Sequence, residues 1–170
     1  NVNYEEIIYE GYAAGGVAVM LNIVTDNRNR TAADVRHIFD KTGGSLGQTG
    51  SVSYMFDYRG QLVVEKNDKI DEDEFMMSAL DAGAEDVITS EDVFEVLTNP
   101  GSFSTVREEL EKQGFSFVSA ERVYIPQTTV EVKDEETVLK IRKLLDMLDE
   151  NGDVVEVYHN AELPEEEEEE

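Results

Sequence analysis

A helix that ends at a glycine and leads directly into an apolar run recurs along this chain. Three helical stretches close with Leu80-Asp81-Ala82-Gly83, Leu110-Glu111-Lys112-Gln113-Gly114 and Leu148-Asp149-Glu150-Asn151-Gly152. A helix followed by a neighbouring strand is the second half of a split βαβ unit, whose helices cover one face of an antiparallel sheet. The sequence therefore predicts an α+β fold with antiparallel sheets and helices on one face.

Apolar periodicity and turn signals place the individual elements. Alternating runs predict strands, an apolar face at helical spacing predicts helices, and glycine or proline marks their ends. Thr31 and Asp134 are the expected N-caps of two helices, and the last helix has the apolar stripe Val138, Ile141, Leu145 and Leu148. We expect strands at 4–12, 17–24, 52–56, 61–65, 86–89, 93–97, 115–125, 128–132 and 154–158, a turn at 57–60, and helices at 31–41, 71–80, 100–113 and 135–150.

The stretch Thr25-Asp26-Asn27-Arg28-Asn29-Arg30-Thr31 is a polar, basic corner between a strand and a helix. The free N–H groups and the dipole at a helix N-terminus favour an anion, and two arginines stand beside them. The corner therefore predicts a phosphate or carboxylate contact. A turn whose arginines pair with nearby acids explains the same residues equally well, because surface ion pairs are common and weak.

Negative charge dominates the chain but is unevenly distributed. The formal net charge is −25, of which residues 1–55 carry −2, residues 56–127 carry −11 and residues 128–170 carry −12. Such a surface repels nucleic acid over roughly 8 Å at physiological salt. A nucleic-acid contact must therefore come from the near-neutral first third or from a part of the protein that is not present.

The residue patterns do not favour catalysis or a bound cofactor. The chain has no cysteine, and neither His37 nor His159 has a second catalytic group beside it in the sequence. Metal-ligand spacings are absent, and Gly11–Gly16 lacks the following helix that a dinucleotide site needs. No apolar run approaches the roughly 20 residues of a membrane span. We expect no enzyme activity, no metal, no cofactor and no membrane partner.

Tyr54, Phe56 and Tyr58 alternate along a predicted strand, which would point their rings to one face. Aromatic rings on a sheet can stack RNA bases. A core face is the better interpretation, because only Arg59 supplies nearby positive charge.

Several short motifs in the first third of the chain carry a resemblance. They are Tyr9-Glu10-Gly11-Tyr12, Gly15-Gly16-Val17-Ala18, the corner Thr25–Thr31, Val35-Arg36-His37, Gly43-Gly44 and Gly50-Ser51-Val52. Together they resemble the YebC/PmpR family of probable transcriptional regulators, which includes the mitochondrial translational activator of cytochrome c oxidase. The similarity is dense from Tyr9 to Phe56 and continues in register to about residue 163. Ala13-Ala14 departs from the Gly-Pro that the family usually has there.

The resemblance implies a domain organisation. Residues 1–54 and 128–163 would form one discontinuous α+β domain, and residues 56–126 would be a ferredoxin-like domain inserted into it, both of split-βαβ type. The resemblance also implies a basic, helical N-terminal domain, which we expect to be missing here. The run of acids at 165–170 predicts a disordered tail over residues 164–170, because like charges repel one another.

The resemblance further implies a non-enzymatic regulator of gene expression in the cytoplasm, with DNA-binding transcriptional control as the first interpretation. A ribosome-associated translation factor is the alternative, and a small-molecule-binding or enzymatic ferredoxin-like domain is the third. The implied partner is nucleic acid, DNA or ribosomal RNA, contacted mainly through the missing domain; the oligomeric state stays open. The expected nucleic-acid or phosphate contacts are Asn27, Arg28, Asn29, Arg30, Thr31 and Arg36, and the expected partner contacts are Tyr12 and His37.

Overall fold

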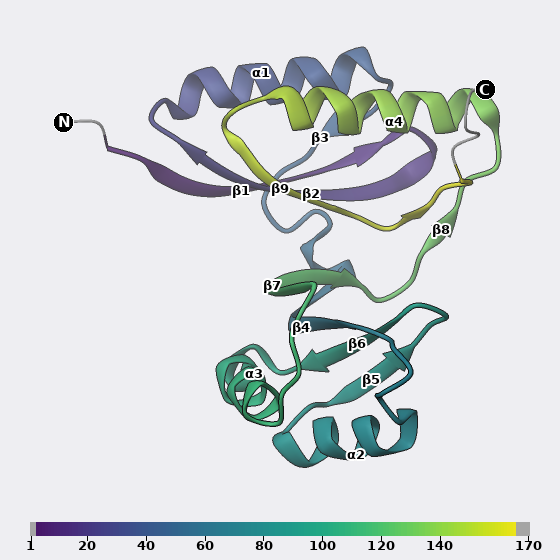
Figure 1. Cartoon of the computed structure of the whole chain (residues 1–170). Coiled ribbons are helices and arrows are strands. Elements are labelled where there is room, and N and C mark those ends of the chain that lie inside the picture. The colour runs from purple at the N-terminus through teal and green to yellow at the C-terminus, as the bar shows by residue number, and fades with distance from the viewer. Residues whose placement is uncertain (1–2, 166–170) are drawn as a thin grey trace. The chain divides into compact units, whose positions relative to one another are not determined.

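The computed structural model describes residues 3–165, which form an α+β protein with four α-helices (Figure 1). This confirms the predicted fold class. Residues up to Phe56 and from Pro126 onward form one compact unit, unit 1, and Asp57–Ile125 form a second, unit 2. The predicted domain boundaries stay a prediction, and most of the predicted acidic tail lies outside the described residues. Among the described helices, none is both long enough and apolar enough to span a membrane.

Unit 1 is a four-stranded sheet with two helices on one face (Figure 1). The strand order is β3-β1-β2-β9, and β1 pairs antiparallel with both β2 and β3. The path β2–α1–β3 is therefore a split βαβ unit with β1 between its two parallel strands. Strands β8 and β10 form a separate parallel pair. The elements of unit 1 are β1 (Glu5–Ala13), β2 (Val17–Thr25), α1 (Arg28–Lys41), β3 (Ser45–Leu46), β8 (Val130–Glu131), α4 (Glu135–Glu150), β9 (Val154–His159) and β10 (Ala161–Glu162).

Helix α1 begins three residues earlier than the sequence pattern predicts. Its N-cap is Asn27, whose Oδ1 accepts a hydrogen bond from the backbone N–H of Arg30 at 3.1 Å. The prediction of Thr31 as the N-cap is wrong, because Thr31 lies in the first helical turn and is fully buried. Asp134 is confirmed as the N-cap of α4, since its carboxylate accepts a hydrogen bond from the Thr137 N–H at 3.1 Å.

The core of unit 1 lies between the sheet and the two helices. On α4, Leu144 is fully buried, whereas Leu145 is only partly buried, so the stripe predicted through Leu145 is wrong at that position. Each helical residue turns by about 100°, which carries Leu145 from the sheet-facing side to the rim. The fully enclosed apolar residues of this core include Val17, Leu21, Ile23, Val35, Phe39, Ile141, Leu144 and Leu148.

Unit 2 has the strand and helix order of a ferredoxin-like domain. Its sheet has the order β5-β6-β4-β7, in which the first strand of the unit lies between the third and the fourth. Both helices cover one face of this sheet (Figure 1), and the core between them includes Leu62, Phe75, Phe94, Val106 and Leu110. The elements are β4 (Phe56–Glu65), α2 (Glu72–Ala82), β5 (Asp86–Thr89), β6 (Val93–Thr98), α3 (Phe103–Lys112) and β7 (Ser119–Pro126).

The turn predicted at 57–60 is wrong, because β4 runs without a break from Phe56 to Glu65. Gly60 is a close-packing position: a Cβ there would lie 2.6 Å from the ring of Phe103 and would also collide with the hydroxyl of Thr98. The sequence signal of a turn glycine and that of a packing glycine are the same.

The predicted strand at 52–56 is also wrong. Residues Ser53–Met55 form a short 3-10 turn, so Tyr54, Phe56 and Tyr58 do not alternate on one strand. Phe56 is buried, while Tyr54 and Tyr58 are exposed. The interpretation of these three rings as one core face therefore fails.

A single carboxylate fixes the glycine-containing loop that follows β3. Glu10 is only 3% exposed and accepts hydrogen bonds from the backbone N–H groups of Gly50, Val52 and Ser53 at 2.7, 3.0 and 2.6 Å. Burial by itself raises the pKa of Glu10, but the three donors outweigh it, and the pKa lies below the usual 4.5. The ionised form of Glu10 therefore holds the loop in place.

Leu144→Ala should lower the free energy of unfolding by about 2–5 kcal/mol, the usual cost of a cavity in a closed core. Leu145→Ala should cost clearly less, because solvent and neighbouring side chains can occupy a space at the rim. Urea unfolding of both variants measures the difference. An equal or larger loss for Leu145→Ala would contradict this description of α4.

Glu10→Gln should destabilise the chain at neutral pH by about 1.5–3 kcal/mol, the range for hydrogen bonds to a charged group. A glutamine amide must turn an NH2 group toward at least one of the backbone donors. Because the pKa of Glu10 is lowered by folding, its stabilisation is present above the unfolded-state pKa and is lost as the pH falls through the folded-state value.

Thermal melts of wild type and Glu10→Gln across that range should therefore converge at low pH. A stability difference that is independent of pH would show that the carboxylate charge does not hold the loop.

Candidate nucleic-acid interface

Arg30, one of the two arginines of the corner, is directed to acids of unit 1. Its Nη2 lies 2.9 Å from Asp26 and 3.1 Å from Asp153, which follows α4. The second contact joins residues 123 positions apart in the sequence. Arg30 therefore connects the β2–α1 corner to the α4–β9 corner.

A buried hydroxyl pair completes this connection. The Thr31 hydroxyl lies 2.7 Å from the Thr25 hydroxyl and donates to the Asp153 carboxylate at 2.8 Å. Both threonines are almost fully buried. The hydrogen bond from Thr31 lowers the pKa of Asp153, burial opposes it, and Arg30 adds to it, so the carboxylate stays ionised. Thr25, Arg30, Thr31 and Asp153 thus form one polar network, the corner network.

The remaining predicted contact residues lie on the exposed face of α1. Arg28 pairs with Glu5 at 3.3 Å, but both side chains are about 60% exposed, so water and a competing anion can reach the pair. The side chains of Asn29, Arg36 and His37 are exposed, and within residues 3–165 they bond to no other side chain. Arg28 and Arg36 are eight residues apart, which separates them by about 12 Å along the helix.

Helix α1 also differs from the other described helices in its charge. It carries four basic and two acidic residues, whereas α2, α3 and α4 each carry more acidic than basic residues. Lys41 extends the positive charge to the C-terminal end of α1, where it also suits the helix dipole. Among the described helices, α1 is therefore the one in which basic residues outnumber acidic residues.

Tyr12 lies away from this face. It precedes Ala13 on β1, and alternate residues of a strand point to opposite sides, so Tyr12 points away from the helices that Ala13 contacts. Its hydroxyl is 3.5 Å from the carbonyl oxygen of Ser51, and burial together with the neighbouring Tyr54 raises the pKa of Tyr12. The structure does not bring Tyr12 together with the α1 residues.

His159 has a structural contact and no catalytic partner in the described part of the chain. Its Nδ1 accepts a hydrogen bond from the Ala161 N–H at 3.1 Å, and burial lowers the pKa of His159. The neutral ring thus supports the bend between β9 and β10. Residues 3–165 contain no cluster of three or more histidine, aspartate or glutamate side chains that could hold a metal ion.

Sequence reasoning missed two acids that organise the site. Asp153 contacts Thr31 across 122 residues, and a pattern read within a local window has no signal for such a pair. Glu5 precedes the motifs of the first third, and its pairing with Arg28 depends on the strand order of the sheet. The alternative of arginines paired with nearby acids is met at Arg30, which contacts Asp26 within the corner, but Asp153 and Glu5 are distant in the sequence.

We expect the Thr31–Asp153 hydrogen bond to contribute directly to stability. Thr31→Val keeps the shape of the side chain and removes the donor, which leaves the carboxylate partly unsatisfied. A double-mutant cycle of Thr31→Val and Asp153→Asn should give a coupling energy of about 0.5–3 kcal/mol. Thr31→Ser, which retains the hydroxyl, is the matched control. Strictly additive effects in the cycle would show that the two corners are not joined by this bond.

Comparison with known proteins places these features in a family. The sequence model described as the TACO1/YebC second and third domain matches residues 4–161. A probable transcriptional regulatory protein of Clostridium novyi is 62% identical over 165 residues, covering 97% of this chain and 67% of the relative. One of Clostridium tetani is 55% identical with the same coverage, and one of Acetivibrio thermocellus is 54% identical over 94% of this chain and 66% of the relative.

The fold is shared with a solved structure. The crystal structure of a conserved hypothetical protein from Aquifex aeolicus superposes with a TM-score of 0.85 at 46% sequence identity, over 98% of this chain and 68% of that one. This chain thus spans about two thirds of the length of the relatives that it matches. On the matched family model and these identities, the chain belongs to the TACO1/YebC family.

Proposed function

We propose that this chain is part of a non-enzymatic regulator of gene expression, a transcriptional regulatory protein acting in the cytoplasm. We further propose that the exposed face of α1 contacts the phosphate groups of nucleic acid. The relatives named as probable transcriptional regulatory proteins support the first statement. The charge of α1 supports the second, because it is the described helix in which basic residues outnumber acidic ones.

The observation that carries the proposal is a difference between the side chains of the corner motif and of α1. Some of them are bonded within the fold, and others are exposed. Arg30 and Thr31 are engaged in the corner network, and Asn27 caps the helix. The contact residues of the proposal are therefore Arg28, Asn29, Arg36 and His37, whose side chains are exposed. Arginine donates to phosphate oxygens in a forked geometry, and asparagine and histidine can add neutral donors.

The acidity of the remaining chain limits the strength of this contact. With a net charge of −25, long-range repulsion opposes association with any polyanion. Close contacts at α1 act inside the screening distance of roughly 8 Å, where local positive charge outweighs the distant acids. We therefore expect weak binding by this chain near physiological salt and measurable binding at low salt.

Duplex DNA is the partner that we expect for a transcriptional regulator, and ribosomal RNA presents the same phosphate chemistry. Phosphate contacts position a protein without reading sequence, so α1 would bind different sequences about equally. Binding to ribosomal particles in preference to duplex DNA would indicate a role in translation instead of transcription. Sedimentation of the chain with ribosomal particles, run beside the DNA titration, separates the two partners.

Replacing Arg28 or Arg36 by glutamine should weaken binding to duplex DNA for all sequences alike. Each change should make the plot of log K against log salt less steep by about one unit, because one fewer counterion is released. A titration from about 20 to 100 mM salt by fluorescence anisotropy measures both quantities. Thermal midpoints should stay nearly unchanged, since neither side chain is buried.

Arg107→Gln is the matched control, because Arg107 is an exposed arginine of α3 with a single ion pair to Glu111 at 3.0 Å. It removes the same charge from unit 2 and should leave the slope unchanged. An equal loss in Arg107→Gln, or no binding by wild type at the lowest salt, would overturn the proposed interface.

A further inference from the structure

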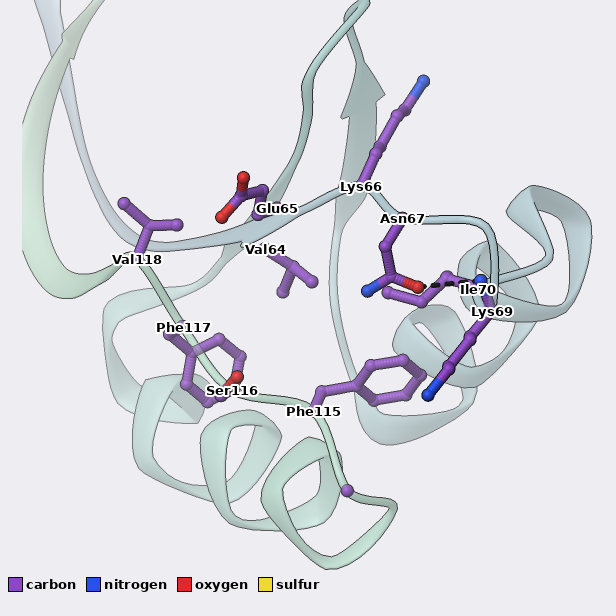
Figure 2. A pocket seen from close by; sticks show the side chains of 11 residues that line it. Val64, Glu65, Lys66, Asn67, Lys69, Ile70, Phe115, Ser116, Phe117 and Val118 are labelled. Carbon is purple, nitrogen blue, oxygen red and sulfur yellow. Dashed lines mark hydrogen bonds between the residues drawn. The ribbon is translucent and has the colours of Figure 1, made fainter.

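A hollow of about 660 Å³ opens in unit 2 between the end of β4 and the segment that precedes β7 (Figure 2). Val64, Glu65 and Lys66 form one side, and residues 114–118 form the other. The turn 66–70 closes one end. Its volume lies within the range of about 300–1,000 Å³ that small-molecule pockets occupy.

The hollow lies where the hydrogen-bond ladder of the sheet stops. The Val118 N–H donates to the Val63 carbonyl at 2.8 Å, and on the other side of β4 the Lys66 N–H donates to Asp92 at 2.9 Å. Because backbone groups alternate in direction along an antiparallel strand, the N–H and C=O of Glu65 face the segment 114–118.

The next rung on that side of β4 would join Glu65 to Ser116, yet no backbone hydrogen bond joins them in the described chain. Glu65 thus presents one backbone donor and one acceptor toward the hollow. Because Glu65 is exposed, water can pair with these two groups until a ligand replaces it. An extended peptide that lies beside a strand supplies the matching acceptor and donor.

Positive charge stands at the closed end. Lys69 follows a tight turn in which the Asn67 side chain accepts a hydrogen bond from the Lys69 N–H at 2.8 Å. Its side chain extends toward Phe115, whereas Lys66 points away from the hollow (Figure 2). Among residues 3–165, Lys69 forms no ion pair, while Lys66 lies 4.0 Å from Glu72. An unpaired ammonium at the end of a hollow is suited to one carboxylate.

Apolar side chains line the space between the free backbone groups and the lysine. Phe115 and Phe117 are half-buried, and Val64 and Ile70 complete the wall. The ring of Phe115 stands edge-on to Phe75 with 5.0 Å between centroids, which fixes its position. This wall can receive one apolar side chain of moderate size.

We propose that this hollow binds the C-terminal end of an extended peptide whose last residue is apolar. The peptide backbone would pair with the N–H and C=O of Glu65, its terminal carboxylate would bind Lys69, and its last side chain would pack on Phe115 and Phe117. A polyanion fits poorly, since unit 2 is strongly acidic and Glu65 is part of the rim. This site is separate from α1 and does not depend on the function proposed above.

Titration of the isotope-labelled chain with the peptide N-acetyl-Gly-Gly-Leu, observed by ¹H–¹⁵N correlation spectra, tests the proposal. Saturable shifts are expected at the amides of Glu65, Lys66, Lys69 and Ser116. The same peptide with a C-terminal amide, and one ending in glycine, should each bind clearly more weakly. Equal binding of N-acetyl-leucine would overturn the peptide in favour of a small carboxylate, and no shift at millimolar peptide would overturn the site.

Lys69→Gln should weaken binding of N-acetyl-Gly-Gly-Leu by about tenfold, as expected for the loss of a charged hydrogen bond. Lys112→Gln is the matched control, because Lys112 is an exposed lysine of the same unit whose Nζ lies 3.4 Å from Glu109. It should bind like wild type, and both variants should melt like wild type. Equal affinity of Lys69→Gln and wild type would overturn the role of Lys69 and with it the proposal.

Discussion

The hydrogen bond from Thr31 to Asp153 fixes two corners of unit 1 to each other, because it joins the start of α1 to the segment that follows α4. Both helices lie on the same face of the sheet, and each reaches it through a corner that must expose or satisfy polar backbone groups. The Asp153 carboxylate, which belongs to the α4–β9 corner, accepts hydrogen bonds from two side chains of the β2–α1 corner. Removing it would take the carboxylate acceptor from Thr31 and leave Arg30 with Asp26 as its remaining ion pair.

The corner motif therefore combines two kinds of side chain within seven residues. Side chains that point inward hold the fold, and those that point outward at Arg28 and Asn29 are available to a partner. A match to the motif shows family membership without saying which of its residues meet the partner. The three-dimensional contacts show which side chains are engaged within the chain: Arg30 is paired with Asp26 and Asp153, whereas Arg36 is exposed.

Local sequence patterns predicted most of the elements, because strand alternation and helix caps are properties of neighbouring residues. The cap at Asp134 and the strand at 86–89 are examples. The failures share a cause. Gly60 is a glycine because Phe103 lies against it, and Leu144 is buried instead of Leu145 because of how α4 is rotated on the sheet. Contacts between distant residues, such as Thr31 with Asp153, leave no local pattern.

The attachment of the loop after β3 to Glu10 has a consequence for sequence variation. Three hydrogen bonds to this carboxylate come from backbone N–H groups, so these bonds do not depend on which side chains the loop carries. Exposed positions such as Gln48 and Thr49 can therefore change identity freely, whereas a proline at Val52 or Ser53 removes a donor. In an evolving sequence, a change at Glu10 would therefore affect the position of this loop, although Glu10 lies 40 residues before Gly50 in the chain.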